Sequence, residues 1–196
     1  SEDMEYYPLS PAQARLYLVQ EIDPESTAYN MPEVVELIGV PAKKPLNEKF
    51  RKLIERHESL RTSFPLIDRD PVQRIHHTDD IEFVVEYHEN QPVDLIIRGF
   101  IRPFDLTRPP LLRATVVHTP GDRCFLITDM HHIISDAVSN TILIRDFTTL
   151  SRHETLPSIK LQYKDYSQWV HREFTGESGK LKQQEAFWLN VFDGPL

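Results

Sequence analysis

Two apolar runs on either side of a turn signal constrain the fold of this chain more than any other stretch. Residues 111–130, "LLRATVVHTPGDRCFLITDM", carry Pro120, Gly121 and Asp122 between the two runs. This composition is typical of a tight turn, so the runs are expected to form an antiparallel hairpin. The hairpin and the short spacing of the other predicted strands favour a mixed sheet over a doubly wound parallel one.

Helical and strand patterns interleave along the rest of the chain. Ser10 as a candidate N-cap, Pro11 at the first helical position and Gln13 three residues after the cap form a capping box that predicts the first helix. Further helices are predicted at 45–60, 92–102, 135–150, 163–174 and 180–192, and strands at 31–40, 61–67, 71–75 and 81–87. The predicted fold class is therefore α/β (α+β), a mixed β-sheet packed with helices, as one domain or as one lobe of a larger one.

Two of the predicted helices carry apolar stripes that should face the strands between them. The helix at 45–60 has five residues at helical spacing: Leu46, Phe50, Leu53, His57 and Leu60. The helix at 135–150 has Val138, Ile142 and Phe147 on one side. Both stripes are expected to contribute to the core.

Composition argues against several classes of protein. The chain has 196 residues, of which 40% are hydrophobic, so it can bury a core. Its formal charge of -8 argues against nucleic acid as a partner. No apolar run approaches the roughly 18 residues of a membrane helix, and residues 1–10 lack the features of a secretion signal, so a cytoplasmic protein without a membrane span is expected. The single Cys124 lies in an apolar run, where a packed thiol is expected.

A histidine doublet at a strand-to-helix junction is the first candidate for chemistry. His131 and His132, in "DMHHIISDAVSN" at 129–140, lie where a buried strand ends and where Ser135 or Asp136 caps the following helix. Such a junction holds side chains rigidly at a sheet edge and leaves them accessible.

A second doublet offers a comparison for the first. His76 and His77 run into an acidic turn and are interpreted as part of a solvated surface turn. In the first doublet, neighbouring residues on an extended segment point to opposite faces, so His131 and His132 are not expected to share a metal ion. Both histidines could occupy polar positions at the strand end without taking part in any reaction. The alternative is acid–base chemistry by one histidine, because a pKa near 6.5 suits proton transfer at neutral pH.

Four motifs occur in the order found in a known family. "MHHIISDAVS" at 130–139 resembles the His-His-x-x-x-Asp-Gly motif of the condensation domains of nonribosomal peptide synthetases, which are related to chloramphenicol acetyltransferase. The three others are "SPAQARLYL" at 10–18, "RHESLRTSF" at 56–64 and "YKDYSQW" at 163–169. The resemblance implies one lobe of a chloramphenicol acetyltransferase-like two-lobed fold. Residues 1–196 would form its N-terminal subdomain, with the C-terminal subdomain absent.

The resemblance also implies a reaction and its partners. In the family, an acyl or peptidyl thioester on a donor carrier protein is attacked by the amine of an aminoacyl thioester on an acceptor carrier. Both substrates arrive on 4'-phosphopantetheine, no cofactor is bound directly, and an adenylation domain belongs to the same synthetase. "STAYNMP" at 26–32 and "RPFDLTRPPLLRA" at 102–114 resemble the subtype that joins an L-configured donor to an L-configured acceptor.

Matching the motifs position by position assigns roles to single residues. His132 corresponds to the catalytic histidine, acting as a general base or as a hydrogen-bond partner of the transition state, and His131 to a structural member of the turn. Asp136 would hold the loop through an ion pair with Arg56 or Arg61. Ala137 stands where the family usually has glycine, and its methyl group could narrow the substrate channel.

Three alternatives to a catalytic condensation domain remain at the level of the sequence. The first is a non-catalytic relative that only docks a carrier or partner protein. The second is an epimerisation domain, which shares the histidine doublet but differs in the motifs at 10–18 and 56–64. A metal-dependent hydrolase is the third. Because the family's active site lies between two lobes, residues 1–196 alone are expected to fold but to form no amide.

Overall fold

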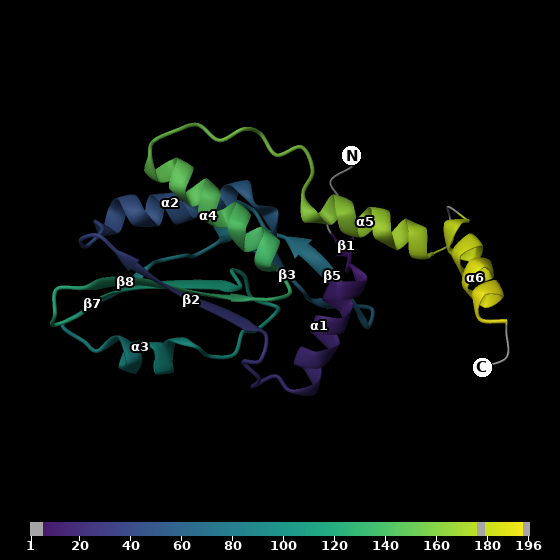
Figure 1. Cartoon of the computed structure of the whole chain (residues 1–196), viewed down its shortest axis with the longest axis horizontal. Coiled ribbons are helices and arrows are strands. Elements are labelled where there is room, and N and C mark those ends of the chain that lie inside the picture. The colour runs from purple at the N-terminus through teal and green to yellow at the C-terminus, as the bar shows by residue number, and fades with distance from the viewer. Residues whose placement is uncertain (1–5, 176–178, 194–196) are drawn as a thin grey trace.

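The computed structural model describes residues 6–175 and 179–193. The first five residues, where no secretion signal was expected, and the last three lie outside the described residues. Helices and strands interleave as the sequence predicted (Figure 1). None of the described helices is long and apolar enough to cross a membrane.

The main sheet is mixed, as the hairpin signal predicted. It contains β2 (Asn30–Leu37), β8 (Cys124–His131), β7 (Leu112–His118) and β6 (Glu86–Glu89), in the order β2-β8-β7-β6. β8 pairs antiparallel with both β2 and β7, whereas β6 runs parallel to β7. β8 and β7 are therefore the two inner strands of this sheet, each with a partner on both sides. The register of β8 places Asn30 opposite His131 and Leu112 opposite Met130.

Four shorter strands form a second set of pairs beside the main sheet. They are β1 (Tyr7–Pro8), β3 (Thr62–Ser63), β4 (Leu66–Ile67) and β5 (Asp70–Ile75), and each of the other three pairs with β5. The strand predicted at 81–87 is wrong over 81–85, which form no strand, because pairing with β7 begins only at Glu86 and continues to Glu89.

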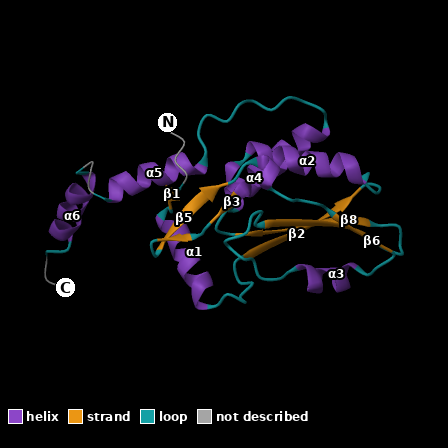
Figure 2. Ribbon diagram, turned by 180° about the vertical axis from the view of Figure 1, so that it is seen from behind, coloured by secondary structure: helices purple, strands orange, loops and turns teal. Residues whose placement is uncertain are grey.

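Helices cover both faces of the main sheet. α2 (Lys43–Arg56) and α4 (Ala137–Ser151) pack on one face, and α3 (Val93–Phe100) lies on the other (Figure 1). α1 (Pro11–Ile22) and α5 (Tyr163–Phe174) flank the short strands, and α6 (Lys180–Val191) extends beyond them (Figure 2). Within the described residues, η1 (Glu58–Arg61) and η2 (Thr78–Asp80) are short 3-10 helices.

The start of α1 confirms the capping box. The Ser10 Oγ accepts the backbone N–H of Gln13, and the Gln13 Oε1 accepts the backbone N–H of Ser10 at 3.0 Å. These reciprocal bonds satisfy two backbone donors that would otherwise lack partners at the helix start.

The apolar stripe predicted at 45–60 is confirmed for its first three residues, but α2 ends at Arg56, so His57 and Leu60 lie beyond it. The stripe predicted for α4 is also wrong in part. Leu46, Phe50 and Leu53 are buried in the main core. In α4, however, Val138 and Ile142 are exposed, and the buried side consists of Leu143, Asp146, Phe147 and Leu150. Apolar residues occur all round α4, so periodicity alone could not select the face that packs on α2.

Candidate functional site

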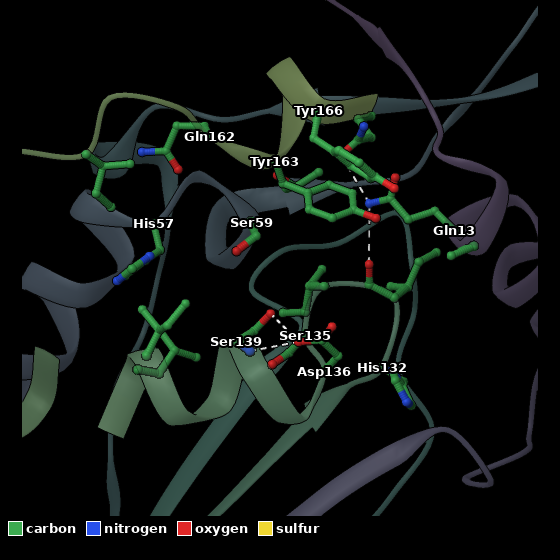
Figure 3. A pocket seen from close by; sticks show the side chains of 18 of the residues that line it. Gln13, His57, Ser59, His132, Ser135, Asp136, Ser139, Gln162, Tyr163 and Tyr166 are labelled. Atoms are coloured by element: carbon green, nitrogen blue, oxygen red, sulfur yellow. Dashed lines mark hydrogen bonds between the residues drawn. The ribbon is translucent and has the colours of Figure 1, made fainter. Parts of the chain in front are cut away.

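An open pocket of about 610 Å³ lies where α1, α4 and α5 approach the segment that follows β8 (Figure 3). Gln13 lines it from α1, Tyr163 and Tyr166 from α5, and Ser139 from α4. His132, Ser135 and Asp136 line it from the junction between β8 and α4. All four family-like motifs therefore line this pocket, and the motif at 56–64 does so through Arg56, His57, Ser59, Thr62 and Phe64.

The two histidines of the doublet have opposite environments. His131 is 1% exposed and lies edge-on to the Phe104 ring, whereas His132 is exposed at the pocket. The prediction that neighbouring residues on this extended segment point to opposite sides is thus confirmed. In Figure 3, His132 lies at one end of the pocket lining, away from His57 and Gln162 at the other.

Backbone hydrogen bonds on both sides fix the segment that carries the doublet. The His131 N–H donates to the carbonyl of Leu111 at 3.1 Å, and the His132 N–H donates to the carbonyl of Tyr29 at 2.8 Å. The Ile134 N–H then donates to the His131 carbonyl at 3.2 Å, which closes a turn. His132 is therefore an accessible imidazole on a backbone that is held from two neighbouring segments.

His131 is held as a buried, neutral ring. Burial and the neighbouring His132 lower the pKa of His131 to about 4. The Ile133 N–H donates to its Nδ1 at 3.0 Å, so the ring uses that nitrogen as an acceptor. Of the two rings, only that of His132 is accessible from the pocket.

Asp136 does not form the ion pair that the sequence suggested. It is the N-cap of α4, and its Oδ1 accepts the Ser139 backbone N–H at 2.7 Å and the Ser139 hydroxyl at 2.6 Å. These bonds, the hydroxyl foremost, lower the pKa of Asp136. Arg61 instead contacts Glu58 and the carbonyl of His76, so it is committed to a different loop.

Arg56, the other candidate partner of Asp136, pairs with Asp146 in a buried cluster that the sequence did not reveal. Asp146 is fully buried, and its Oδ2 accepts bonds from the Arg56 Nε at 2.8 Å and the His57 Nε2 at 2.9 Å. Its Oδ1 accepts bonds from the Arg145 guanidinium. The cluster joins the end of α2 to α4, and its sequence signal is an aspartate among the apolar residues of the packed side of α4, Leu143, Phe147 and Leu150.

Opposing effects set the protonation of this cluster. Burial alone would raise the pKa of Asp146, but the bonds from Arg56, His57 and Arg145 lower it below its ordinary value. Burial also lowers the pKa of His57, and this effect exceeds the attraction of Asp146. Asp146 is therefore charged at neutral pH, and His57 is a neutral donor to it.

Ala137 does not narrow the pocket. It is the first residue of α4 and is exposed, whereas Asp136 and Ser139 on either side of it supply the pocket wall. The expectation that its methyl group narrows the channel therefore finds no support in the pocket lining. The helical backbone at this position accommodates alanine without strain.

The second doublet is only partly the surface turn that the sequence suggested. His77 is exposed, but His76 is half-buried and its Nε2 lies 2.8 Å from the Ser63 Oγ. Neither lines the pocket. Across the described ranges, 6–175 and 179–193, no group of three or more histidine, cysteine or acidic side chains is arranged to hold a metal ion.

Comparison with known proteins places this geometry in a family. The profile of the condensation domain matches residues 3–196. The chain is 43% identical over 198 residues to bacitracin synthase 3 of Bacillus licheniformis, covering 100% of this chain and 3% of that protein. It is 43% identical over 188 residues to gramicidin S synthase 2 of Brevibacillus brevis, covering 96% of this chain and 4% of that protein.

Solved structures share the fold. The starter condensation domain of rhizomide synthetase RzmA matches with a TM-score of 0.78 at 19% identity, over 96% of this chain and 48% of that one. The first condensation domain of the calcium-dependent antibiotic synthetase, in complex with a substrate analogue, matches with a TM-score of 0.74 at 18% identity, over 97% of this chain and 50% of that one. The chain thus spans about half of a solved condensation domain, and it belongs to the condensation domain family.

Proposed function

We propose that this chain is the N-terminal subdomain of a catalytic condensation domain that forms an amide between two carrier-bound substrates. The observation that supports this most directly is the accessible imidazole of His132, held by backbone bonds at the edge of a pocket. The names of the relatives, which are peptide synthases, agree with such a reaction.

The proposed step transfers an acyl group from sulfur to nitrogen. The amine of the acceptor attacks the carbonyl carbon of the donor thioester, a C–N bond forms, and the C–S bond breaks. The amine loses one proton and the thiolate of the donor arm gains one. His132 either accepts the amine proton or stabilises the transition state by a hydrogen bond. An α-amino group with a pKa near 7.7–8.0 is already partly neutral at physiological pH, so the reaction is compatible with either role of His132.

The other residues of the site would act by positioning. Asp136 caps α4 and fixes the turn after the doublet, and His131 supports the turn from inside the core. Neither residue needs to exchange a proton with the substrate. This division of roles agrees with the burial of His131 and the exposure of His132.

The partners follow from the same proposal. Donor and acceptor carrier proteins would deliver substrates on 4'-phosphopantetheine, and a C-terminal subdomain would supply the other wall of the substrate channel. An adenylation domain would belong to the same synthetase, no cofactor would bind the chain directly, and the protein would work in the cytoplasm. The motifs at 26–32 and 102–114 support an L-configured donor and an L-configured acceptor.

The test is amide formation by the complete condensation domain that contains this chain, with loaded donor and acceptor carriers. His132→Ala should lower the rate by about 10²-fold or more, the range of a positioned acid–base group. His77→Ala is the control, because His77 is exposed and lies outside the pocket lining. Equal rates for wild type and His132→Ala would reject the catalytic proposal and favour the docking alternative.

A further inference from the structure

Gln20 is a buried amide near the end of α1 that contacts the doublet without touching the pocket. It is 4% exposed, and its Nε2 donates to the carbonyl of Pro24 at 3.0 Å. Its Oε1 lies 3.2 Å from the Nε2 of His131. The same helix presents Gln13 to the pocket, as Figure 3 shows, so the two glutamines have separate surroundings.

The partners of His131 determine where its ring proton lies. The Nδ1 accepts the backbone N–H of Ile133 at 3.0 Å, so in the neutral ring the proton is on Nε2. That Nε2–H points at Gln20, whose Oε1 is free to accept it because the amide NH2 is used by Pro24. Each polar atom in this series of bonds has a single consistent role as donor or acceptor.

The orientation of the His131 ring in turn determines the position of the next residue. The ring receives the Ile133 N–H, and the His131 carbonyl receives the Ile134 N–H at 3.2 Å. His132 lies between the backbone groups that these two bonds hold. In a cationic His131, the Nδ1–H would point at the Ile133 N–H and repel it. This repulsion disfavours the cation, in agreement with the lowered pKa of His131, about 4.

We propose that Gln20 is a positioning residue for amide formation, because its carbonyl holds His131 as the Nε2–H tautomer and thereby fixes the turn that carries His132. This inference rests on the proposed function of His132. Without the acceptor, a buried N–H loses its partner and the ring and the turn can relax. A displacement of about 1 Å at a catalytic group can cost about 10²-fold in rate.

The experiment uses the complete condensation domain labelled with ¹⁵N-histidine, and it combines ring N–H spectra with steady-state kinetics. Gln20→Met keeps the approximate volume but removes the acceptor. Gln20→Glu, measured at pH 6.5, can reproduce both bonds, because a buried carboxyl tends to stay protonated and then has one acceptor and one donor. Val117→Ala is the control for general destabilisation, since Val117 is fully buried in the separate cluster with Phe100 and Ile127.

The wild type should show a protected His131 ring proton on Nε2. In Gln20→Met this signal should shift or disappear, and kcat should fall by about tenfold to 10²-fold with little change in the KM for the loaded carriers. Gln20→Glu should keep the signal and most of the activity. Val117→Ala should keep both, although its melting temperature falls.

Several outcomes would overturn the proposal. A wild-type ring proton on Nδ1 would do so, as would a Gln20→Met variant with unchanged signal and kcat, or equal losses of kcat in Gln20→Met and Val117→Ala. If Gln20→Met does not fold, the test rests on Gln20→Glu. Loss of the His131 ring-proton signal or of activity in Gln20→Glu would then count against the proposal. If His132→Ala keeps full activity, the proposed function fails, while the ring spectra still test the contact between Gln20 and His131.

Discussion

Replacement of Asp146 by asparagine should destabilise the protein far more than the same replacement at Asp136. Asp146 is fully buried and accepts bonds from Arg56, His57 and Arg145, so Asp146→Asn removes the one negative charge from this cluster and turns an NH2 group toward donors. Asp136 is an exposed N-cap, and asparagine caps helices about as well as aspartate.

The magnitudes follow from burial. Breaking a buried ion pair from one side costs roughly 3–5 kcal/mol, and the lower end applies because the Arg145 side chain is 65% exposed and can turn to water. Asp136→Asn loses only the interaction of a charge with the helix dipole, about 0.3–1 kcal/mol. For a domain of this size, each kcal/mol of unfolding free energy corresponds to about 2–4 °C in melting temperature.

The assay is thermal unfolding of both variants and the wild type, followed by circular dichroism at pH 7 and low salt. A cost of about 3 kcal/mol at Asp146 corresponds to a decrease of about 6–12 °C, and the decrease at Asp136 should stay below about 4 °C. Equal decreases, or a larger one at Asp136, would refute the assignment of the structural anchor to Asp146 and restore the ion pair that the sequence suggested.

Three further outcomes are expected. Burial lowers the pKa of His131 to about 4 in the folded state, so the unfolded chain binds the extra proton first as pH falls below 6.5. The free energy of unfolding from urea titrations should therefore decrease by roughly 2 kcal/mol between pH 7 and pH 5. A constant urea midpoint over this range would contradict the buried neutral ring. Ala137→Gly should cost at most about 1 kcal/mol of stability and leave the rate of amide formation nearly unchanged, because Asp136 and Ser139 form the pocket wall instead; a large gain in rate would restore the narrowed channel. Residues 1–196 alone should unfold cooperatively in urea but give no amide detectable by mass spectrometry, and turnover that His132→Ala abolishes would show that one wall of the pocket is enough.

Local signals predicted the parts of the fold that depend on neighbouring residues. The capping box at Ser10, the turn between β7 and β8, and the N-cap at Asp136 each involve residues within a few positions, so sequence alone could identify them. The opposite orientations of His131 and His132 followed from strand geometry in the same way.

Features that depend on packing between distant elements could not be predicted. Arg56 lies 90 residues from Asp146 in the sequence, and only the contact between α2 and α4 brings them together. Val138 and Ile142 have the spacing of a buried stripe, yet α4 uses its other side because that side meets α2. Gln20 is one of several glutamines in the chain, and nothing in its local sequence points to the ring 111 residues away.

The pairing of β8 on both sides has a consequence for how this sequence can change over evolutionary time. Side chains alternate between the faces of a strand, so a slip of one position would exchange the buried His131 with the accessible His132. With Asn30 fixed opposite His131, a single-codon deletion between Cys124 and His131 would force such an exchange or break the pairing with β2. Insertions in the turn at 119–123 leave that pairing intact. Lineages derived from this chain should therefore vary freely in the length of that turn and keep constant the number of residues between the turn and the doublet.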